Sequence, residues 1–169
     1  MRVTVIALAL VCGIVGPAAL AEEPTPRCAA TVAPKDELAP WVNPAPFPVE
    51  ISGAQPAERY LRAGQAVTLR LHPADHLSLP VEPKKPGGSG GLVALSIVET
   101  GTYRMALSSA AWIDVIQEGR VLESVSHGHG PDCSGIRKIV DFALSPGRYT
   151  IQLTGNAEST TRLLVAKKP

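Results

Sequence analysis

Residues 146–153, Pro-Gly-Arg-Tyr-Thr-Ile-Gln-Leu, place a glycine turn directly before a strand in which apolar and polar side chains alternate. The same layout recurs at 63–71, where Ala-Gly precedes Val, Leu and Leu at every second position, and at 100–107, where Thr-Gly precedes Tyr, Met and Leu. A period of two is typical of a strand that buries one face. The repeated unit therefore predicts a β-sheet protein whose core contains Tyr103, Met105, Leu107, Tyr149, Ile151 and Leu153.

Other strand patterns lie between these three units, and Gly, Pro, Asp and Ser separate them. They cover 92–98, 111–117, 121–126, 136–144 and 161–166. Short, evenly spaced strands without intervening helices favour an antiparallel sandwich or barrel. We therefore predict an all-β fold, an antiparallel β-sandwich of the jelly-roll type with about eight strands, over residues 63–169.

The second face of the predicted strands carries the residues that alternate with the core set. Arg104 and Gln152 belong to this face, where we expect substitutions to change the free energy of unfolding by less than about 0.5 kcal/mol. Asp114 and Asp141 also lie within strand patterns, and we expect them to face solvent or to cap turns.

A proline-rich N-terminal arm, residues 22–62, precedes the predicted sandwich. Proline lacks the N–H group that helices and central strands require, so we expect an extended or irregular arm with short turns. Trp41 and Phe47 are apolar anchors that predict an arm lying across the folded body. A short helical turn is expected at 35–38 or at 57–61.

Residues 1–21 have the layout of a cleavable secretory signal peptide. Arg2 precedes an apolar run over 3–15, and Ala19-Leu20-Ala21 supplies the small residues of a cleavage site. The run is shorter than the ~20 residues needed to cross a bilayer. We therefore predict a periplasmic or secreted protein that begins near Glu22 and has no membrane span after signal cleavage.

The charge balance argues against nucleic-acid binding. The chain has 16 Lys and Arg and 15 Asp and Glu, and loss of Arg2 with the signal leaves 15 of each sign. A formally neutral domain lacks the clustered positive charge that attracts nucleic acid. The expected partner is therefore a small molecule, a glycan or a protein of unknown identity.

Two cysteines remain once Cys12 leaves with the signal: Cys28 in the arm and Cys133 in the body. An exported protein meets an oxidising environment, which favours a disulfide between them. That bond would tie the arm to the loop that carries the two most unusual histidines.

This histidine loop, residues 126–133, reads Ser-His-Gly-His-Gly-Pro-Asp-Cys. Residues two apart on an extended segment face the same side, so His127 and His129 could present two imidazoles to one transition metal ion such as Fe, Zn or Cu. Asp132 or a reduced Cys133 could supply a third ligand, and the cations Arg137 and Lys138 nearby could attract an anion. The alternative, which we favour, is a glycine-rich surface turn that holds no metal.

Three segments carry a resemblance to a known family: GGLVALSIVETGTYRMAL (90–107), AWIDVIQEGR (111–120) and IVDFALSPGRYTIQL (139–153). Their strand pattern, over 91–166, is similar to that of bacterial pre-peptidase C-terminal domains and related jelly rolls. The resemblance implies a non-catalytic β-sandwich accessory module.

The whole chain also resembles a group of short exported bacterial proteins that carry the stretch HGHGPDCSGIRK, here 127–138, and that are sometimes labelled homogentisate 1,2-dioxygenase. A cupin-type iron dioxygenase requires a His-x-His motif, a carboxylate and a later histidine. No histidine follows His129, so His72 or His76 would have to supply the missing ligand from upstream.

Two further features leave their roles open. The loop 73–91 joins a proline-rich half to a glycine-rich half, and loops of this length are often functional. Trp41 and Trp112 could form a sugar-stacking platform, but roles in the core or in docking the arm are favoured.

The sequence as a whole favours an exported, non-catalytic binding or accessory module without a cofactor. The alternative is a small metal-dependent protein, an oxygenase or a metal-handling protein, that uses His127 and His129. No Gly-x-Ser-x-Gly nucleophile elbow supports a hydrolase.

Signal cleavage can be tested directly. We expect the exported protein to begin near Glu22, because signal peptidase reads the small residues just before it. Intact-mass measurement of exported protein checks this expectation. Full-length chain in the membrane fraction would contradict it.

Overall fold

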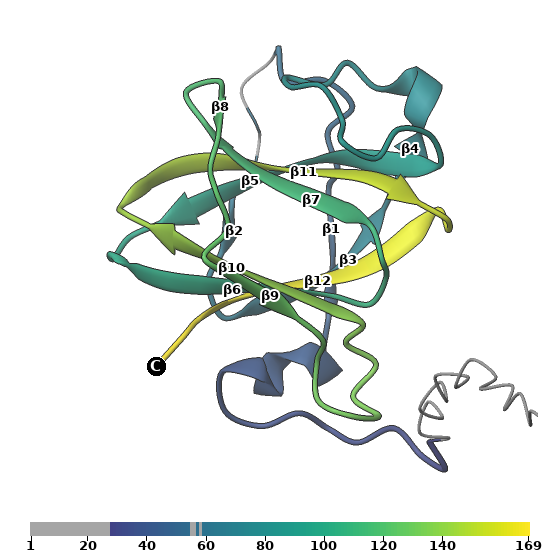
Figure 1. The fold of residues 1–169 in the computed structure, drawn as a ribbon, viewed down its shortest axis with the longest axis vertical. Coiled ribbons are helices and arrows are strands. Elements are labelled where there is room, and N and C mark those ends of the chain that lie inside the picture. Colours follow the sequence, from purple (N-terminus) through teal and green to yellow (C-terminus); the bar gives the residue numbers. More distant parts are fainter. Residues whose placement is uncertain (1–27, 55–56, 58) are drawn as a thin grey trace, which may run out of the picture.

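The computed structural model describes residues 28–54, 57 and 59–169. The predicted signal peptide, 1–21, lies outside the described residues. The described chain folds into two β-sheets packed face to face as a sandwich (Figure 1). In chain order its elements are η1 (Asp36–Val42), β1 (Ala45–Phe47), β2 (Leu61–Arg62), β3 (Gln65–Arg70), β4 (His72–Pro73), η2 (Ala74–His76), β5 (Ser89–Ile97), β6 (Gly101–Leu107), β7 (Trp112–Gln117), β8 (Arg120–Val121), β9 (Ser126–Gly128), β10 (Lys138–Leu144), β11 (Gly147–Asn156) and β12 (Thr160–Lys167).

The first sheet has the strand order β1-β3-β12-β6-β10-β9, and the second has the order β2-β5-β11-β7-β8, with β4 also paired to β5. The predicted all-β sandwich is therefore confirmed. Between the strands the pairing is antiparallel except at two places, β1 with β3 and β2 with β5, which are parallel. Both exceptions come from the arm, which joins the sheet edges through long connections and not through hairpins.

The inner faces of the two sheets form the core. The three glycine-strand units became β3, β6 and β11. All six predicted core residues are buried in one cluster: Tyr103, Met105, Leu107, Tyr149, Ile151 and Leu153. The local period of two was sufficient to identify this layer, because successive side chains of a strand point to opposite faces.

The outer face of the first sheet is covered by the arm. Leu38 and Trp41 of the 3₁₀ helix η1 pack onto outward-facing residues of the sheet, which include Ala106 and Leu164. Arg104 lies on this covered face, where its guanidinium contacts Glu37 at 2.6 Å and Asp141 at 3.1 Å. A remote segment therefore covers the face that we expected to be open at Arg104, and the cost of substituting Arg104 stays a prediction.

The outer face of the second sheet is covered as well. Gln152 is fully buried, and its side-chain amide donates a hydrogen bond of 3.2 Å to the carbonyl oxygen of Val81 in the loop 73–91. The backbone of this loop also passes close to β11, since a Cβ atom at Gly155 of β11 would lie 2.8 Å from the carbonyl oxygen of Lys85. The burial of Gln152 contradicts the open outer face on which the expected tolerance rested, and the cost of its substitution stays a prediction.

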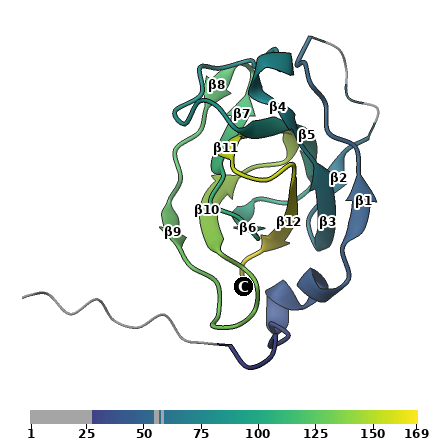
Figure 2. The same ribbon diagram turned by 90° about the vertical axis from the view of Figure 1, so that its right-hand side faces the viewer.

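The prediction of one continuous strand over 121–126 is wrong, because the residues in the middle of this range are not in a strand. Only Arg120–Val121 and Ser126–Gly128 are strands, and residues 122–125, here called the strap, cross from one sheet to the other (Figure 2). The N–H of Leu122 donates to Val115 of β7 at 2.8 Å, and that of Val125 donates to Asp141 of β10 at 2.8 Å. The strap therefore bridges the sheets along one open side of the sandwich.

The predicted disulfide between Cys28 and Cys133 is present. Nearby, the N–H of Val32 donates to the carbonyl oxygen of Cys133 at 2.8 Å, and the indole N–H of Trp41 donates to that of Ser134 at 3.0 Å. The arm is therefore fixed to the loop before β10. Within the described residues, no helix has the length and apolar character needed to cross a membrane.

Coverage of both sheet faces predicts an unusual mutational pattern. Leu107→Ala should lower the free energy of unfolding by ~2–5 kcal/mol, because it leaves a cavity in the core. Gln152→Ala, on the outer face, should still cost about 1–3 kcal/mol, because the carbonyl of Val81 loses its buried partner.

Urea unfolding measures both effects, with Thr68→Ala as the control, because Thr68 is exposed on β3 and its loss should cost within about 0.5 kcal/mol. If Gln152→Ala behaves like Thr68→Ala, the loop 73–91 does not cover β11 in solution.

Candidate functional site

The two histidines of the predicted metal motif both border a hollow of about 350 Å³ beside Asp141, but their surroundings differ. His127 lies on β9 directly opposite Val140 of β10, and residues directly opposite in antiparallel strands share a face. His127 therefore lies on the side of β9 that faces between the sheets. His129 follows the end of β9, and its ring Nδ1 lies 2.9 Å from the carbonyl oxygen of Arg137. Asp132 and Arg137 are exposed in the same loop.

The proposed third metal ligands are not assembled around these imidazoles. Cys133 is in the disulfide, which removes it as a thiolate ligand. His72 and His76 lie on β4 and η2, and β4 pairs with β5 of the second sheet. Across residues 28–54, 57 and 59–169, no group of three or more His, Cys, Asp or Glu side chains is placed to hold a metal ion. The metal-binding alternative stays a prediction.

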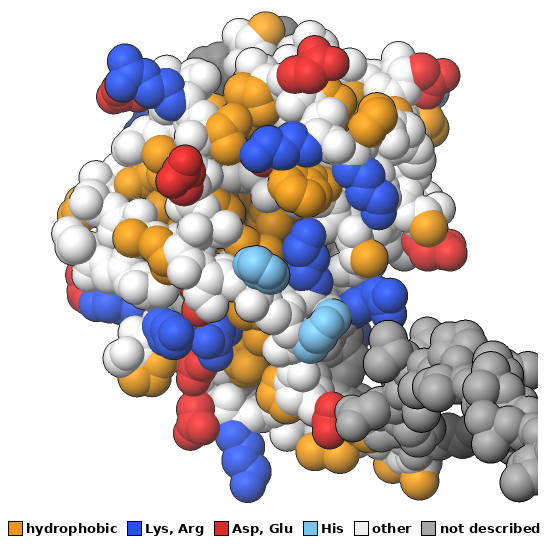
Figure 3. All heavy atoms as spheres, in the orientation of Figure 1, with side chains coloured by type: hydrophobic (Ala, Val, Ile, Leu, Met, Phe, Trp, Pro, Cys, Tyr) orange, Lys and Arg blue, Asp and Glu red, His pale blue; other side chains and the backbone are white. Residues whose placement is uncertain are grey.

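His127 and Lys138 instead meet residues from other segments around a pocket of about 600 Å³. We call it the inter-sheet pocket, because β7, β10 and the strap surround it. Figure 3 shows apolar side chains on this face of the molecule lying between cationic, histidine and acidic side chains, and the lining of the pocket includes the carboxylates of Asp114 and Glu123. Its lining residues are Lys84, Trp112, Ile113, Asp114, Val121, Leu122, Glu123, Ser124, His127, Lys138, Val140 and Phe142.

The floor of the inter-sheet pocket is part of the core. Ile113 of β7 and Val140 and Phe142 of β10 belong to the core cluster, and Leu122 of the strap packs against it. At this side the sandwich is open, because β8 pairs with β7 only at Ile116 and Gln117. Ile113, Val140 and Phe142 themselves remain buried, so they form the base of the pocket below its more exposed lining.

The rim of the inter-sheet pocket is built around Trp112. The ammonium groups of Lys84 and Lys138 lie 5.6 Å and 5.1 Å from the centroid of its ring, a distance at which the π-electrons attract a cation. Lys138 also donates to the carbonyl oxygen of Ala111 at 3.0 Å. Partial burial lowers the pKa of Lys138, and the charge of Lys85 lowers it further while Asp114 opposes the shift.

Asp114 is buried beside this rim, with 4 % of its surface exposed. The indole N–H of Trp112 donates to its Oδ1 at 3.0 Å, whereas Oδ2 has no hydrogen-bond partner among the described residues. The expectation that Asp114 and Asp141 face solvent or cap turns is wrong, because Asp141 is buried too and pairs with Arg104. The second oxygen of Asp114 is buried, and it is an acceptor left without a hydrogen-bond partner among the described residues.

The two tryptophans do not form one platform. Trp41 is 1 % exposed and lies under the first sheet's outer face with η1, and the guanidinium of Arg162 lies 5.1 Å from its ring centroid. Trp112 belongs to the opposite sheet and is only partly buried. The docking role favoured for Trp41 is thus confirmed, and Trp112 alone remains available at a site.

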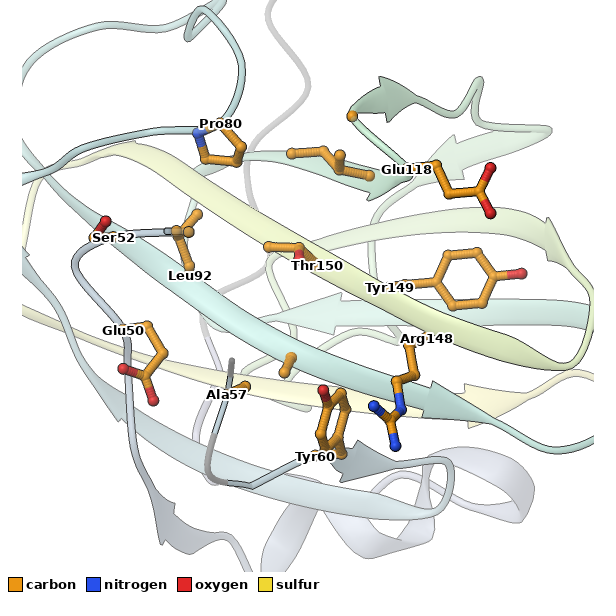
Figure 4. A pocket seen from close by; sticks show the side chains of 14 residues that line it. Glu50, Ser52, Ala57, Tyr60, Pro80, Leu92, Glu118, Arg148, Tyr149 and Thr150 are labelled. Carbon is orange, nitrogen blue, oxygen red and sulfur yellow. The ribbon is translucent and has the colours of Figure 1, made fainter. Parts of the chain in front are cut away.

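A second hollow, of about 300 Å³, lies on the outer face of the second sheet. Figure 4 shows Tyr60 beside Arg148 at one end and Glu50 and Glu118 on its sides. The guanidinium of Arg148 lies 4.9 Å from the ring centroid of Tyr60. Ala57 belongs to its lining, and the neighbours of Ala57 in the sequence lie outside the described residues, so we place no function there.

Sequence reasoning identified only part of the inter-sheet pocket. It singled out His127 and Lys138, and it named Trp112 and Asp114 without joining them to the histidine loop. Lys84 was not connected to either, because it comes from the loop 73–91. The segment around Trp112 mixes apolar and polar residues, but strands that lie wholly in a core commonly show the same mixture. This pattern therefore did not distinguish a binding site from a core strand.

The metal alternative can be tested by thermal unfolding. We expect Zn²⁺, Cu²⁺ or Fe²⁺ to leave the melting temperature unchanged, because His127 and His129 are held by different surroundings. A metal at 100 times its dissociation constant would stabilise the protein by ~2.7 kcal/mol, which is easily measured. A shift with one metal that disappears in both His127→Ala and His129→Ala would contradict this expectation.

Comparison of the chain with protein-family models, with curated proteins and with solved structures finds no match. The inter-sheet pocket is therefore the feature from which function is inferred.

Proposed function

We propose that this protein is an exported, non-catalytic binding module that holds a small amphipathic ligand, an apolar body with an anionic group, in the inter-sheet pocket. The observation that carries the proposal is the combination of an apolar floor, from Ile113 and Phe142, with the cations Lys84 and Lys138 at the rim. Sites that bind small molecules commonly pair an apolar lining with a few convergent polar groups.

The floor supplies the affinity for an apolar body. A ligand that removes about 150 Å² of apolar surface from water gains about 4 kcal/mol before the costs of association. Val140 and Phe142 are held in the core cluster, so this surface is already formed and need not be ordered on binding. Such preorganisation favours measurable binding even by a small ligand.

The rim supplies the preference for an anion. Lys138 is only partly exposed, and burial has removed part of the water that would stabilise its charge. An anionic group beside Lys138 and Lys84 would restore that stabilisation and form charge-assisted hydrogen bonds. A hydroxyl or amide on the ligand could donate to the free Oδ2 of Asp114.

The arrangement of polar groups supports binding over catalysis. Ser124 and His127 both line the pocket, but in the described part of the chain no hydrogen bond joins them. Asp114 accepts from Trp112 and not from an imidazole. A nucleophile, a base and an orienting group joined in series would instead favour acyl-transfer chemistry.

Export is supported by the disulfide between Cys28 and Cys133, because disulfides persist mainly in oxidising compartments. The signal-like composition of residues 1–21 agrees with this proposal.

Anilinonaphthalene sulfonate, a fluorescent probe with an apolar body and a sulfonate, tests the proposal. We expect one probe molecule to bind per folded chain, and Lys138→Gln to weaken binding about tenfold because a charged partner is lost. Lys35→Gln is the matched control, since it removes the same charge from an exposed position on the arm. Each variant must first show a cooperative melt, so that probe binding to unfolded chain is excluded.

The pH dependence provides a second readout. The sulfonate stays charged at all pH values used, so binding should follow the protonation of Lys138. Because burial lowers the pKa of Lys138 from 10.5, affinity should be full below the lowered pKa and fall as pH rises through it, earlier than for an exposed lysine. Equal binding by wild type, Lys138→Gln and Lys35→Gln would overturn the proposal.

A further inference from the structure

One edge of β7 presents main-chain groups to the inter-sheet pocket. Glu118 and Gly119 have φ angles of 50° and 76°, and Gln117 pairs with Arg120. Two positive φ angles in a two-residue loop are typical of a type I′ hairpin turn, in which the flanking residues exchange two hydrogen bonds. The main-chain groups of Gln117 therefore point toward β8.

The main-chain N–H and C=O groups of successive residues in a strand point to opposite edges. Those of Val115 and Ile113 must therefore point to the same edge as those of Gln117. The hydrogen bond from Leu122 N–H to the carbonyl oxygen of Val115, at 2.8 Å, confirms this for Val115. Beyond that point the strap leaves β7. Within the described residues, no main-chain or side-chain hydrogen bond reaches the N–H or the C=O of Ile113 on this open edge.

Building on the proposed function, we infer that the ligand of the inter-sheet pocket is the carboxyl terminus of a peptide. Its last residue lies opposite Ile113, antiparallel to β7. The N–H of that residue donates to the carbonyl oxygen of Ile113, and its carboxylate accepts from the Ile113 N–H and from Lys138. Addition of an extended peptide to an open sheet edge is a recurring mode of recognition.

The direction of the bound chain follows from the position of the cations. A chain that runs antiparallel to β7 ends toward Trp112, and the ammonium groups of Lys84 and Lys138 lie around its ring. A parallel chain would place its amino end beside these two cations. Charge complementarity therefore selects the antiparallel direction and a free carboxylate.

The side chain of the last residue is specified by the register. Directly opposite residues of antiparallel strands share a face, and Ile113 belongs to the core cluster with 5 % of the whole residue exposed. The ligand's last side chain thus points between the sheets, onto Val140 and Phe142. An apolar last residue, such as leucine, is expected.

The strap limits recognition to this one residue. Leu122 already occupies the position opposite Val115, so the peptide must turn outward to solvent before it reaches that point. The residues that precede the last one are therefore expected to contribute little, and many peptides with an apolar carboxyl-terminal residue would bind.

The test uses acetyl-alanyl-alanyl-leucine as the free acid and as the carboxyl-terminal amide, with isothermal titration calorimetry on the mature protein. We expect the acid to bind at least about tenfold more tightly than the amide. A third peptide carries an N-methylated leucine, so it has no N–H that could donate to the carbonyl oxygen of Ile113. It should bind at least about tenfold more weakly than the acid, and this comparison needs no substitution in the protein.

Two protein-side measurements complete the design. Lys138→Gln should abolish the difference between acid and amide, whereas Lys35→Gln should preserve it. Hydrogen exchange of the Ile113 amide should slow when the acid peptide is added, because this N–H gains an acceptor. Lysine in place of the last leucine should weaken binding, since a charge would enter the apolar floor.

The outcomes separate this inference from the proposed function. If the sulfonate probe binds in a Lys138-dependent way but acid and amide peptides bind alike or not at all, the peptide inference is wrong and the binding function stands. If the N-methylated peptide binds as well as the acid, the edge of β7 is not used. If neither the probe nor the peptides bind, both proposals are wrong.

Discussion

Packing between the inner faces of the two sheets is the interaction on which the rest of this structure depends. Ile151 and Leu153 of β11 and Met105 of β6 are fully buried in one core cluster, and each such side chain contributes roughly 1.5–3 kcal/mol on burial. This packing sets β7 opposite β10 along one open side of the sandwich. β7 and β10 are not consecutive in the chain, so no hairpin joins them. The core keeps them in separate sheets, and the inter-sheet pocket lies beside both strands.

A second layer of contacts covers the outside of the sandwich. The arm lies on the first sheet through η1 and is held by the Cys28–Cys133 disulfide, which closes a separation of 105 residues. For loops of about this length, the chain-entropy account assigns about 4–5 kcal/mol of stabilisation to the bond. The loop 73–91 covers β11 of the second sheet. The same loop places Lys84 at the rim of the inter-sheet pocket. It therefore both covers part of the second sheet and contributes a cation to the site.

The histidine loop has a different role from the one that its sequence suggests. The ring Nδ1 of His129 lies within hydrogen-bonding distance of the carbonyl oxygen of Arg137, at the other end of the loop. His127 is one of the residues that line the inter-sheet pocket. Trp112 joins several groups at this place, because two ammonium groups lie near its ring and its indole N–H donates to the carboxylate of Asp114. A site of this kind favours selective binding of charge at an apolar surface, because Lys138 is partly buried and Asp114 is buried beside Trp112.

The sequence by itself determined the sheet class, the six residues of the inner layer and the pairing of Cys28 with Cys133. Alternation is a local property of a strand, and two cysteines outside the signal-like segment allow only one intramolecular bond. Only the tertiary structure decided that Gln152 and Asp114 are buried and that Lys84, Trp112 and Lys138 meet. The physical reason is that these outcomes depend on which remote segments cover each sheet, and on where the strap leaves β7. No period of hydrophobicity within a strand encodes contacts between segments that lie far apart in the chain.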